Sequence, residues 1–261
     1  VWWEGKTPAP PADVTGWRDW KGDLISERPE GSDDPWAHPN SRFTTTLTNV
    51  PNIASDFDDP RGVPIDGIIF GGRTPDREPL IRAITDPAEG VYDGLTLGAE
   101  ATFAAEGVEG LLRYDPMSMR PFMSYPEGAY AAHWLKIIGR AREMPIFAHV
   151  NWFQRDHEDG HYLWPGYRDN LRPLLWLMQL KSGEVTGRHT PVGILPTKEE
   201  LNLDGVEITP EDLDKILSID AERWRREMAH REQHLAQFDG LPNEIWAAHR
   251  RIAAVLEQGA D

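Results

Sequence analysis

Residues 146–170 read IFAHVNWFQRDHEDGHYLWPGYRDN and are the most informative segment of the chain. Its first part, 146–153, is largely apolar and predicts a strand. The strand runs into a charged segment that contains the pair Asp159-Gly160. An Asp-Gly pair is typical of a tight turn. We therefore expect a strand followed by a loop that folds back on itself.

Aromatic side chains line both arms of this loop: Trp152, Phe153, Tyr162, Trp164 and Tyr167. Flat rings on either side of a tight turn can face one another, and a slot between two rings accepts a planar heterocycle by stacking. The amide of Asn170 could read the hydrogen-bonding groups at the edge of such a ring. Aromatic pairs across a hairpin also stabilise a sheet without any ligand. The loop alone leaves both interpretations open.

The segments outward from the loop predict a mixed α/β lobe. Residues 1–43 are rich in proline, glycine and tryptophan, and they predict irregular structure. Strands are expected at 65–70 and 111–114, which are apolar and end at Gly-Gly and Asp-Pro pairs. A helix is expected over 129–142, where apolar residues recur on one face.

The last third of the chain, 197–261, predicts a helical region. Thr197 with Glu200 fits a capping box, and Thr209 before Pro210 predicts a second helix start. A final helix is predicted from an apolar stripe at helical spacing: Ile245, Ala248, Ile252, Val255 and Leu256.

The charge balance excludes some classes of partner. The chain has 27 basic and 43 acidic residues and a net charge of −16. Nucleic acids and anionic membranes require a cationic surface, so we expect neither as a partner. The 261-residue sequence has no apolar run of about 18 residues and no signal-peptide pattern. It contains no cysteine, which excludes disulfides and thiolate chemistry. A cytoplasmic soluble protein is the simplest interpretation.

Two short motifs do not support the chemistry they suggest. Gly5-Lys6-Thr7 looks like the end of a phosphate-binding P-loop, but the required upstream glycine is missing and prolines follow. The acidic and histidine residues over 156–161 could ligate a metal, but a solvated hairpin tip explains them better. We expect no metal ligands in this chain.

Several segments occur in the order and at about the spacing found in one enzyme family. They are VWWEGKTPAPPA (1–12), HPNSRF (38–43), GVPIDGIIFGGR (62–73), GAEATFAAEG (98–107), RYDPMSMRPF (113–122), AHWLKIIGR (132–140), the aromatic loop (151–170) and PVGILPTKEELNLDG (191–205). The chain thereby resembles the GTP-dependent phosphoenolpyruvate carboxykinases over its whole length. The resemblance implies the C-terminal nucleotide-binding lobe, residues 1–261, of an enzyme whose upstream half is missing here.

The resemblance also implies an activity. Enzymes of this family convert oxaloacetate and GTP to phosphoenolpyruvate, carbon dioxide and GDP in gluconeogenesis, with Mn²⁺ or Mg²⁺. The metal ligands and the phosphate-binding lysine lie upstream in the family, so we expect this fragment to be inactive alone and the complete enzyme to be a monomer. An alternative from another class is a non-catalytic module whose aromatic slot binds a nucleotide or a sugar. A purely structural role for the aromatic residues is a third possibility.

Two arginines are the candidates for charge stabilisation. The guanidinium fork of Arg42 can hold a carboxylate or a phosphate through two hydrogen bonds, with Asn40 two residues before it. Arg73 follows Gly71-Gly72, where the backbone can approach a ligand. By resemblance, Arg42 is catalytic and contacts both substrate and nucleotide, Asn40 orients the substrate carboxylate, and Arg73 neutralises the terminal phosphates of the nucleotide.

The resemblance assigns guanine binding to the aromatic loop. Phe153, Tyr162 and Tyr167 match the three rings that contact guanine, and Asn170 matches the amide that reads its edge. Animal enzymes carry phenylalanine at the two tyrosine positions, and a phenol ring stacks equally well. ATP-using carboxykinases bind adenine with a different loop, so this segment favours GTP.

A mobile lid is predicted over 98–110, where glycines flank small alanines and provide hinge points. A short alanine-rich helix in the core would give a similar sequence. By resemblance, the lid closes over the active site and excludes water. Its candidate residues are Ala101, Thr102, Ala104 and Ala105. Ala99 stands where family members often have a serine that latches the closed lid, and Thr102 is an alternative latch.

Overall fold

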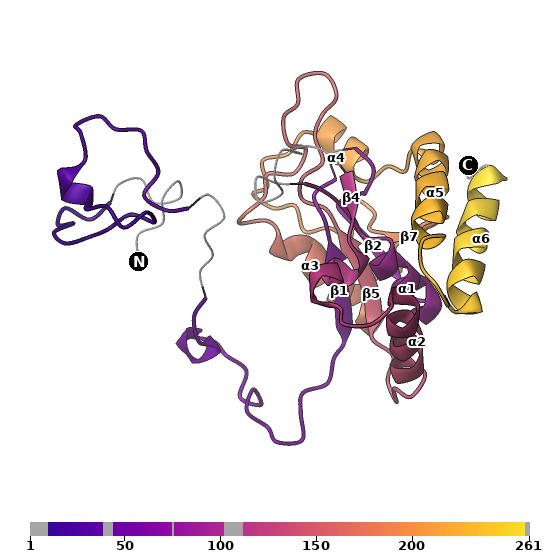
Figure 1. Cartoon of the computed structure of the whole chain (residues 1–261). Helices are drawn as coiled ribbons and strands as arrows, with labels where there is room; N and C mark the ends of the chain where they lie inside the picture. Colours follow the sequence, from indigo (N-terminus) through magenta and orange to yellow (C-terminus); the bar gives the residue numbers. More distant parts are fainter. Residues whose placement is uncertain (1–9, 39–43, 75, 102–111, 259–261) are drawn as a thin grey trace. The chain divides into compact units, whose positions relative to one another are not determined.

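The computed structural model describes residues 10–38, 44–74, 76–101 and 112–258 (Figure 1). The chain divides into two compact units, Val1–Val63 with Ala101–Gly110, and Pro64–Glu100 with Leu111–Asp261. In the first unit, the described residues form turns and the short 3-10 helices η1 (Ile25–Glu27) and η2 (Leu47–Asn49). This irregular structure is what the proline and glycine content predicts over the described part of 1–43.

The second unit is built around a mixed five-stranded sheet. Its strands are β1 (Gly67–Gly71), β2 (Ile81–Ile84), β5 (Ile146–Val150), β6 (Arg188–Thr190) and β7 (Gly193–Leu195). The order is β1-β5-β2-β7-β6; β1 and β5 are parallel and the other neighbours are antiparallel. Strands β3 (Gly98–Glu100) and β4 (Leu112–Tyr114) form a separate antiparallel pair.

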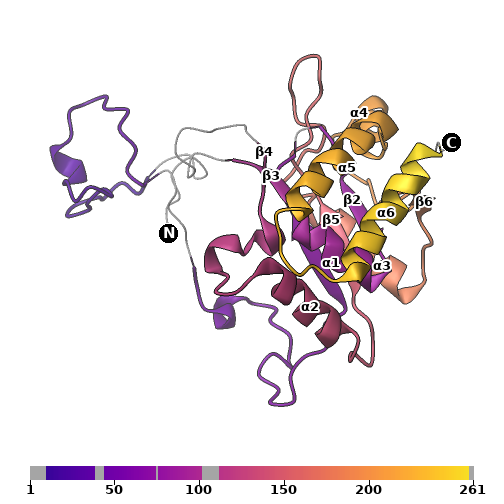
Figure 2. The same cartoon turned by 45° about the vertical axis from the view of Figure 1, so that its right-hand side comes forward.

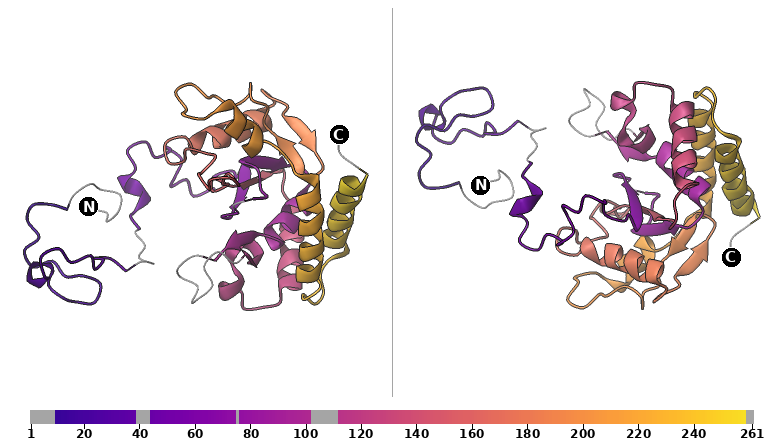
Figure 3. Two further views of the ribbon diagram at one scale, coloured as in Figure 1. Left: turned by 90° about the horizontal axis from the view of Figure 1, so that it is seen from above. Right: turned by 90° about the horizontal axis from the view of Figure 1, so that it is seen from below.

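Helices cover both faces of the large sheet, as Figures 2 and 3 show from three directions. One core contains side chains from α1 (Pro87–Leu95), α2 (Glu127–Ile138), α5 (Ala221–Leu235) and α6 (Asn243–Glu257). The other contains side chains from α3 (Leu171–Ser182) and α4 (Pro210–Ile216). Strand β5 contributes to both, because successive side chains of a strand point to opposite faces. Phe147 packs in the first core and Ala148 in the second.

Most predicted elements are present with shifted ends. The strand expected at 65–70 is β1, and the one expected at 111–114 is β4. The helix expected over 129–142 runs from Glu127 to Ile138 and ends at Gly139. The strand expected over 146–153 stops at Val150, because the side chain of Asn151 binds backbone groups outside the sheet. The mixed α/β class is confirmed.

The predicted helix start at Thr197 is wrong. Residues 198–200 form only a turn. The Glu200 carboxylate does accept the Thr197 N–H at 3.0 Å, as a capping box requires, but it also accepts from Gly187 N at 2.9 Å and Trp176 Nε1 at 3.2 Å. Glu200 therefore joins three segments of the chain instead of starting a helix.

The other helix signals are confirmed. Helix α4 begins at Pro210, and the Thr209 hydroxyl accepts the Asp212 N–H at 3.0 Å. The apolar stripe lies on α6, where all its residues except Val255 are buried. In the parts of the chain that the structure describes, no helix combines the length and apolar character needed to cross a membrane.

Candidate functional site

The loop after β5 is an irregular hairpin. Asp156 N donates to His161 O at 2.8 Å, and Leu163 N donates to Gln154 O at 3.0 Å. Gly160 closes the turn with a φ of +78°, a conformation that favours glycine. Leu163 is buried and anchors the returning arm in the second core. The two arms are therefore held side by side, as the Asp-Gly turn predicts.

The aromatic rings of the loop are only partly assembled. Phe153 and Tyr162 lie edge to face, with ring centroids 6.3 Å apart and planes at 72°. Tyr167 is 92% exposed. This corner offers one ring face for stacking and a second ring beside it. A closed slot between parallel rings does not form between Phe153 and Tyr162.

Arg73 lies against this corner. Its guanidinium carbon is 4.5 Å from the centre of the Phe153 ring, which is the geometry of a cation–π contact. Arg73 follows β1, and Phe153 follows β5, its parallel neighbour in the sheet. The ends of adjacent parallel strands meet at one edge of a sheet, so the sheet brings together two residues that the sequence separates.

A second arginine holds the neighbouring ring. The Arg155 guanidinium carbon lies 4.9 Å from the centre of the Tyr162 ring, and its Nη2 donates to the Tyr162 hydroxyl at 3.0 Å. A phenylalanine at this position could not accept that hydrogen bond. The Tyr162 hydroxyl thus fixes the orientation of its own ring in this chain.

Asn170 lies immediately before α3 at the end of the loop. Its Oδ1 accepts a hydrogen bond from the indole Nε1 of Trp164 at 3.1 Å, and Trp164 is fully buried. This contact orients the amide. The Asn170 Nδ2 group has no partner among the described residues, so it can donate to an acceptor such as a ring carbonyl.

Asn151 connects the Arg73 segment to the aromatic loop. Its Oδ1 accepts from Phe153 N at 3.1 Å and more weakly from Thr74 N at 3.4 Å. Its Nδ2 donates to Thr74 O at 2.6 Å and to Glu78 O at 3.0 Å. The side chain is buried, so these bonds have no competition from water. Asn151 therefore fixes the backbone next to Arg73 relative to the backbone of Phe153.

A charged cavity of about 200 Å³ adjoins the loop and is lined in part by Arg77, Arg155, Asp156, Lys215 and Arg223. Most of its cations already have acidic partners. Lys215 lies 2.8 Å from Asp156, and its hydrogen bond is the main reason that the pKa of Asp156 falls to about 2. Arg223 lies 3.2 Å from Asp220, and Arg77 pairs with Glu227. The cavity is therefore largely neutralised.

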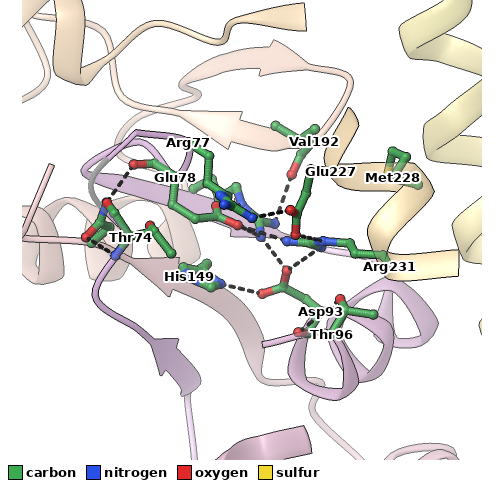
Figure 4. A network of polar contacts seen from close by, with 12 residues as sticks. Thr74, Arg77, Glu78, Asp93, Thr96, His149, Val192, Glu227, Met228 and Arg231 are labelled. Atoms are coloured by element: carbon green, nitrogen blue, oxygen red, sulfur yellow. Dashed lines mark hydrogen bonds and ion pairs between the residues drawn. The ribbon is translucent and has the colours of Figure 1, made fainter. Parts of the chain in front are cut away.

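A network of buried ion pairs lies between the large sheet and helices α1 and α5 (Figure 4). Its members are Arg77, Glu78, Arg82, Asp93, Glu227 and Arg231. Arg82 Nε lies 2.7 Å from Glu78, and Arg231 lies 3.0 Å from Glu78 and 2.9 Å from Glu227. The three arginines balance the three carboxylates. Asp93 also accepts from His149 Nδ1 at 3.0 Å if that nitrogen carries the proton.

The network keeps its carboxylates ionised. Burial opposes ionisation of Glu78, but the charges of Arg82 and Arg231 outweigh it and lower the pKa of Glu78 to about 2. The pKa of Asp93 is lowered against the same effect of burial, chiefly by Arg82. Such a network ties strand β2 and helices α1 and α5 together, because each charge left alone in the interior would be strongly destabilising.

Among the residues that the structure describes, two groups of side chains have metal-like spacing: Glu78, Asp93 and His149 in the network, and Asp156, Asp159 and His161 at the loop tip. Neither suits a divalent cation. The first already has Arg82 and Arg231 as counter-ions. In the second, Asp156 pairs with Lys215, and His161 Nδ1 lies 2.5 Å from Asp159.

Of the predicted site residues, Arg73, Phe153, Tyr162, Tyr167 and Asn170 are described. The first three lie close together, and Asn170 is fixed at the end of the same loop. Ala101 is half-buried and follows β3. The remaining candidates lie outside the described residues: Asn40, Arg42, Thr102, Ala104 and Ala105, together with the rejected motif at 5–7. Their roles stay predictions.

Asn151, Arg155 and the buried network are not among the residues that the sequence predicts as functional. A signal for the network exists, since Arg82 interrupts the apolar strand IRAI and Asp93 falls on the buried face of α1. The polarity of Asn151 at the end of an apolar strand is a weaker signal. Nothing in the sequence indicates that Arg155 contacts Tyr162.

The mixed α/β fold places an arginine and an aromatic loop at the ends of neighbouring strands. This arrangement is compatible with a lobe of a phosphate-transferring enzyme. A family model agrees: residues 1–254 match that of the phosphoenolpyruvate carboxykinase C-terminal P-loop domain. The chain belongs to this family.

Curated relatives named phosphoenolpyruvate carboxykinase [GTP] are similar along the chain. The proteins of Renibacterium salmoninarum and Chlamydia muridarum are each 39% identical, over 94% and 98% of this chain and 40% and 42% of their own lengths. That of Thermoplasma volcanium is 40% identical over 94% of this chain and 40% of its own length. The chain thus spans about two fifths of the relatives it matches and corresponds to their C-terminal portion.

Proposed function

We propose that this chain is the guanine-binding and substrate-contacting part of a GTP-dependent phosphoenolpyruvate carboxykinase. The complete enzyme decarboxylates oxaloacetate and phosphorylates the product reversibly with GTP, giving phosphoenolpyruvate, carbon dioxide and GDP. The observation that carries the proposal is the contact between Arg73 and Phe153, because it places a fixed cation beside a ring that can stack on a base. A nucleotide needs an aromatic ring for its base and a cation for its phosphates, and the parallel pairing of β1 with β5 brings both groups to one edge of the sheet.

The aromatic loop binds the base. Guanine stacks on the face of Phe153, with Tyr162 at its side and Tyr167 folding down from its exposed position. Each stacked ring contributes about 1–3 kcal/mol. Because the Asn170 Oδ1 is already bonded to Trp164, its free Nδ2 donates to the guanine carbonyl oxygen. Adenine has an amino group at that position and would meet a donor with a donor, which explains a preference for GTP.

The arginines act on the phosphate and carboxylate groups. Arg73 neutralises the terminal phosphates, and Arg42 stabilises the charge on the phosphoryl group during its transfer. Asn40 orients the carboxylate of oxaloacetate or phosphoenolpyruvate. The permanent charge of the two arginines suits a reaction in which negative charge moves between oxygen atoms.

The segment that closes over the substrates starts next to Arg73. Glu100 N, at the end of β3, donates to Arg73 O at 2.7 Å. The lid over 98–110 is therefore attached at its base to the backbone of the phosphate-binding arginine. Closure excludes water, so that the enolate left by decarboxylation is phosphorylated before it can take up a proton.

The divalent metal of the reaction is Mn²⁺ or Mg²⁺. Neither described group of acidic and histidine residues fits it, since arginines or a lysine already neutralise both. We therefore place the metal ligands in the rest of the enzyme and assign no step of the metal to this chain.

The rest of the enzyme has a surface to cover. Strand β1 is at the edge of the described sheet and pairs only with β5. An apolar groove of about 500 Å³ runs beside it, lined in part by Ile65, Ile68, Trp134 and Ile137. A monomeric protein rarely exposes such a patch without a partner. We propose that the upstream half of the enzyme packs against this edge.

Nucleotide titration tests the base assignment. The isolated chain is titrated with GTP, GDP, ATP and an oligosaccharide while tryptophan fluorescence is followed. GTP and GDP should bind more tightly than ATP, and the oligosaccharide should not bind. A preference for the sugar would favour the binding-module alternative and reject the carboxykinase assignment.

The variant Asn170→Asp sharpens this test. A carboxylate still accepts from Trp164 but cannot donate to guanine, so we expect GTP binding to weaken about tenfold or more while the free energy of unfolding stays within about 0.5 kcal/mol. Asn52→Asp, at an exposed asparagine outside the loop, is the matched control. Equal binding of GTP by Asn170→Asp and the parent chain would support the purely structural role of the loop.

An activity assay tests whether catalysis requires the rest of the enzyme. The chain alone should form no phosphoenolpyruvate from oxaloacetate and GTP. Measurable formation by the purified chain would refute our placement of the metal ligands and the phosphate-binding lysine outside it.

A further inference from the structure

The side chain of Arg73 has an unusual environment for a cation. Its guanidinium carbon lies 4.5 Å from the centre of the half-buried Phe153 ring. It forms no ion pair with a carboxylate of the described residues, although the chain carries a large excess of acidic groups. Within that part of the chain the Arg73 side chain forms no hydrogen bond, and the Phe153 ring is its one cation–π partner.

The backbone on both sides of this contact is fixed. Arg73 O accepts from Glu100 N at 2.7 Å, and the buried Asn151 amide binds both Thr74 and Phe153. Any exchange of partners by Arg73 must therefore come from rotation of its long side chain about flexible bonds. The ring and the arginine backbone keep their separation while this happens.

A guanidinium and a purine compete for an aromatic face. Both are planar and both stack on the ring, so one face accepts one or the other. A stacked base stabilises its complex more than a cation–π contact at a partly exposed site stabilises the free chain. The base therefore displaces the guanidinium with a small net gain in binding. The displaced guanidinium then has no partner unless the ligand carries an anionic group.

We propose that the Arg73 guanidinium occupies the position of the base in the nucleotide-free chain. Its guanidinium covers the face of Phe153 that guanine takes, and nucleotide binding releases it to the phosphates. This inference rests on the proposed function. It makes Arg73 a specificity-determining residue: a nucleoside has to displace the guanidinium without neutralising it, whereas a triphosphate displaces it and then binds it.

The test compares guanosine with GTP. Dissociation constants are measured by tryptophan fluorescence and calorimetry for the parent chain, Arg73→Met, Arg73→Lys and a control, Arg168→Met. Arg168 is an exposed arginine on the same loop, so its substitution changes the local charge equally. Circular dichroism of each variant verifies the fold.

Opposite effects on the two ligands are expected. Arg73→Met should bind guanosine about two- to fivefold more tightly, because the competitor is gone, and GTP about tenfold or more weakly. Arg73→Lys should tighten guanosine less and retain more GTP binding, since a lysine keeps the charge without the planar group. Arg168→Met should leave guanosine binding within about twofold of the parent.

Three other outcomes would contradict the proposal, each for a different reason. Unchanged guanosine binding in Arg73→Met, with weaker GTP binding, would limit Arg73 to the phosphates and leave the proposed function standing. Weaker binding of both ligands would make the arginine a structural support of the ring. Absence of guanosine and GTP binding in the parent chain and in all variants would overturn the proposed function together with this inference.

Discussion

Asn151 and Thr74 are joined by a pair of hydrogen bonds across the end of the sheet. Asn151 Nδ2 donates to Thr74 O at 2.6 Å, and Asn151 Oδ1 accepts from Thr74 N at 3.4 Å. The same oxygen binds Phe153 N at 3.1 Å. One buried amide thus sets the distance between the segment that carries Arg73 and the aromatic loop. It is the residue on which the geometry of the candidate site most depends.

Replacement of Asn151 should therefore affect both stability and binding. Asn151→Leu leaves buried backbone groups of Thr74, Glu78 and Phe153 without partners, at about 1–3 kcal/mol for each unsatisfied group. We expect the free energy of unfolding in urea to fall by about 3 kcal/mol and GTP binding to weaken. Gln258→Leu, at an exposed amide, should change neither quantity. Full stability of Asn151→Leu would mean that the amide does not hold these segments.

The buried network predicts a large effect at Asp93. The variant Asp93→Asn keeps the shape of the side chain and removes the negative charge that faces Arg82 and Arg231. Breaking one partner of a buried ion pair costs about 3–5 kcal/mol. Urea denaturation should show a loss of this size, whereas the exposed Asp239→Asn should stay within about 0.5 kcal/mol. A small loss at Asp93 would indicate that water reaches the network.

Glu78 predicts how stability depends on pH. Its pKa is about 2 in the folded chain, against an ordinary value of 4.5, so folding favours the ionised form. Its contribution is complete above pH 4.5 and disappears as the pH falls through about 2. Denaturation between these pH values should show a steeper loss of stability for the parent chain than for Glu78→Gln. Parallel curves would exclude Glu78 as a source of the acid sensitivity.

Gly72 packs closely against the first residues of the predicted lid, so a larger side chain at this position tests that packing. A Cβ atom there would lie 2.4 Å from Gly98 O and 3.1 Å from Ala99 Cβ, so Gly72→Ala must shift the backbone. We expect a loss of about 1–3 kcal/mol in stability and weaker GTP binding, because Arg73 moves with it. Gly67→Ala, at the start of the strand that ends just before Gly72, is the matched control, since the atoms nearest to its Cβ would lie 3.7 Å away. Similar behaviour of the two variants would contradict this packing.

The sequence predicts elements best where local signals agree. An apolar run closed by Gly71-Gly72 marks β1, and Thr209-Pro210 marks the start of α4, because chain stiffness and capping act within a few residues. The capping box at Thr197 fails for the opposite reason. There Glu200 also binds Gly187 and Trp176, which are distant in sequence, and these contacts hold the segment in a turn.

In the candidate site, too, local features could be predicted and contacts between distant residues could not. The family, the class of fold and the ring-bearing loop could be predicted from the amino-acid sequence, because they depend on residue order and on turns between close neighbours. Three features became visible only in the folded chain: Arg73 faces Phe153, Asn151 joins their segments, and Arg82, Asp93 and Arg231 neutralise one another. Parallel pairing of β1 with β5 and packing of α5 against α1 create these contacts, and no local pattern of residues encodes such distant pairings.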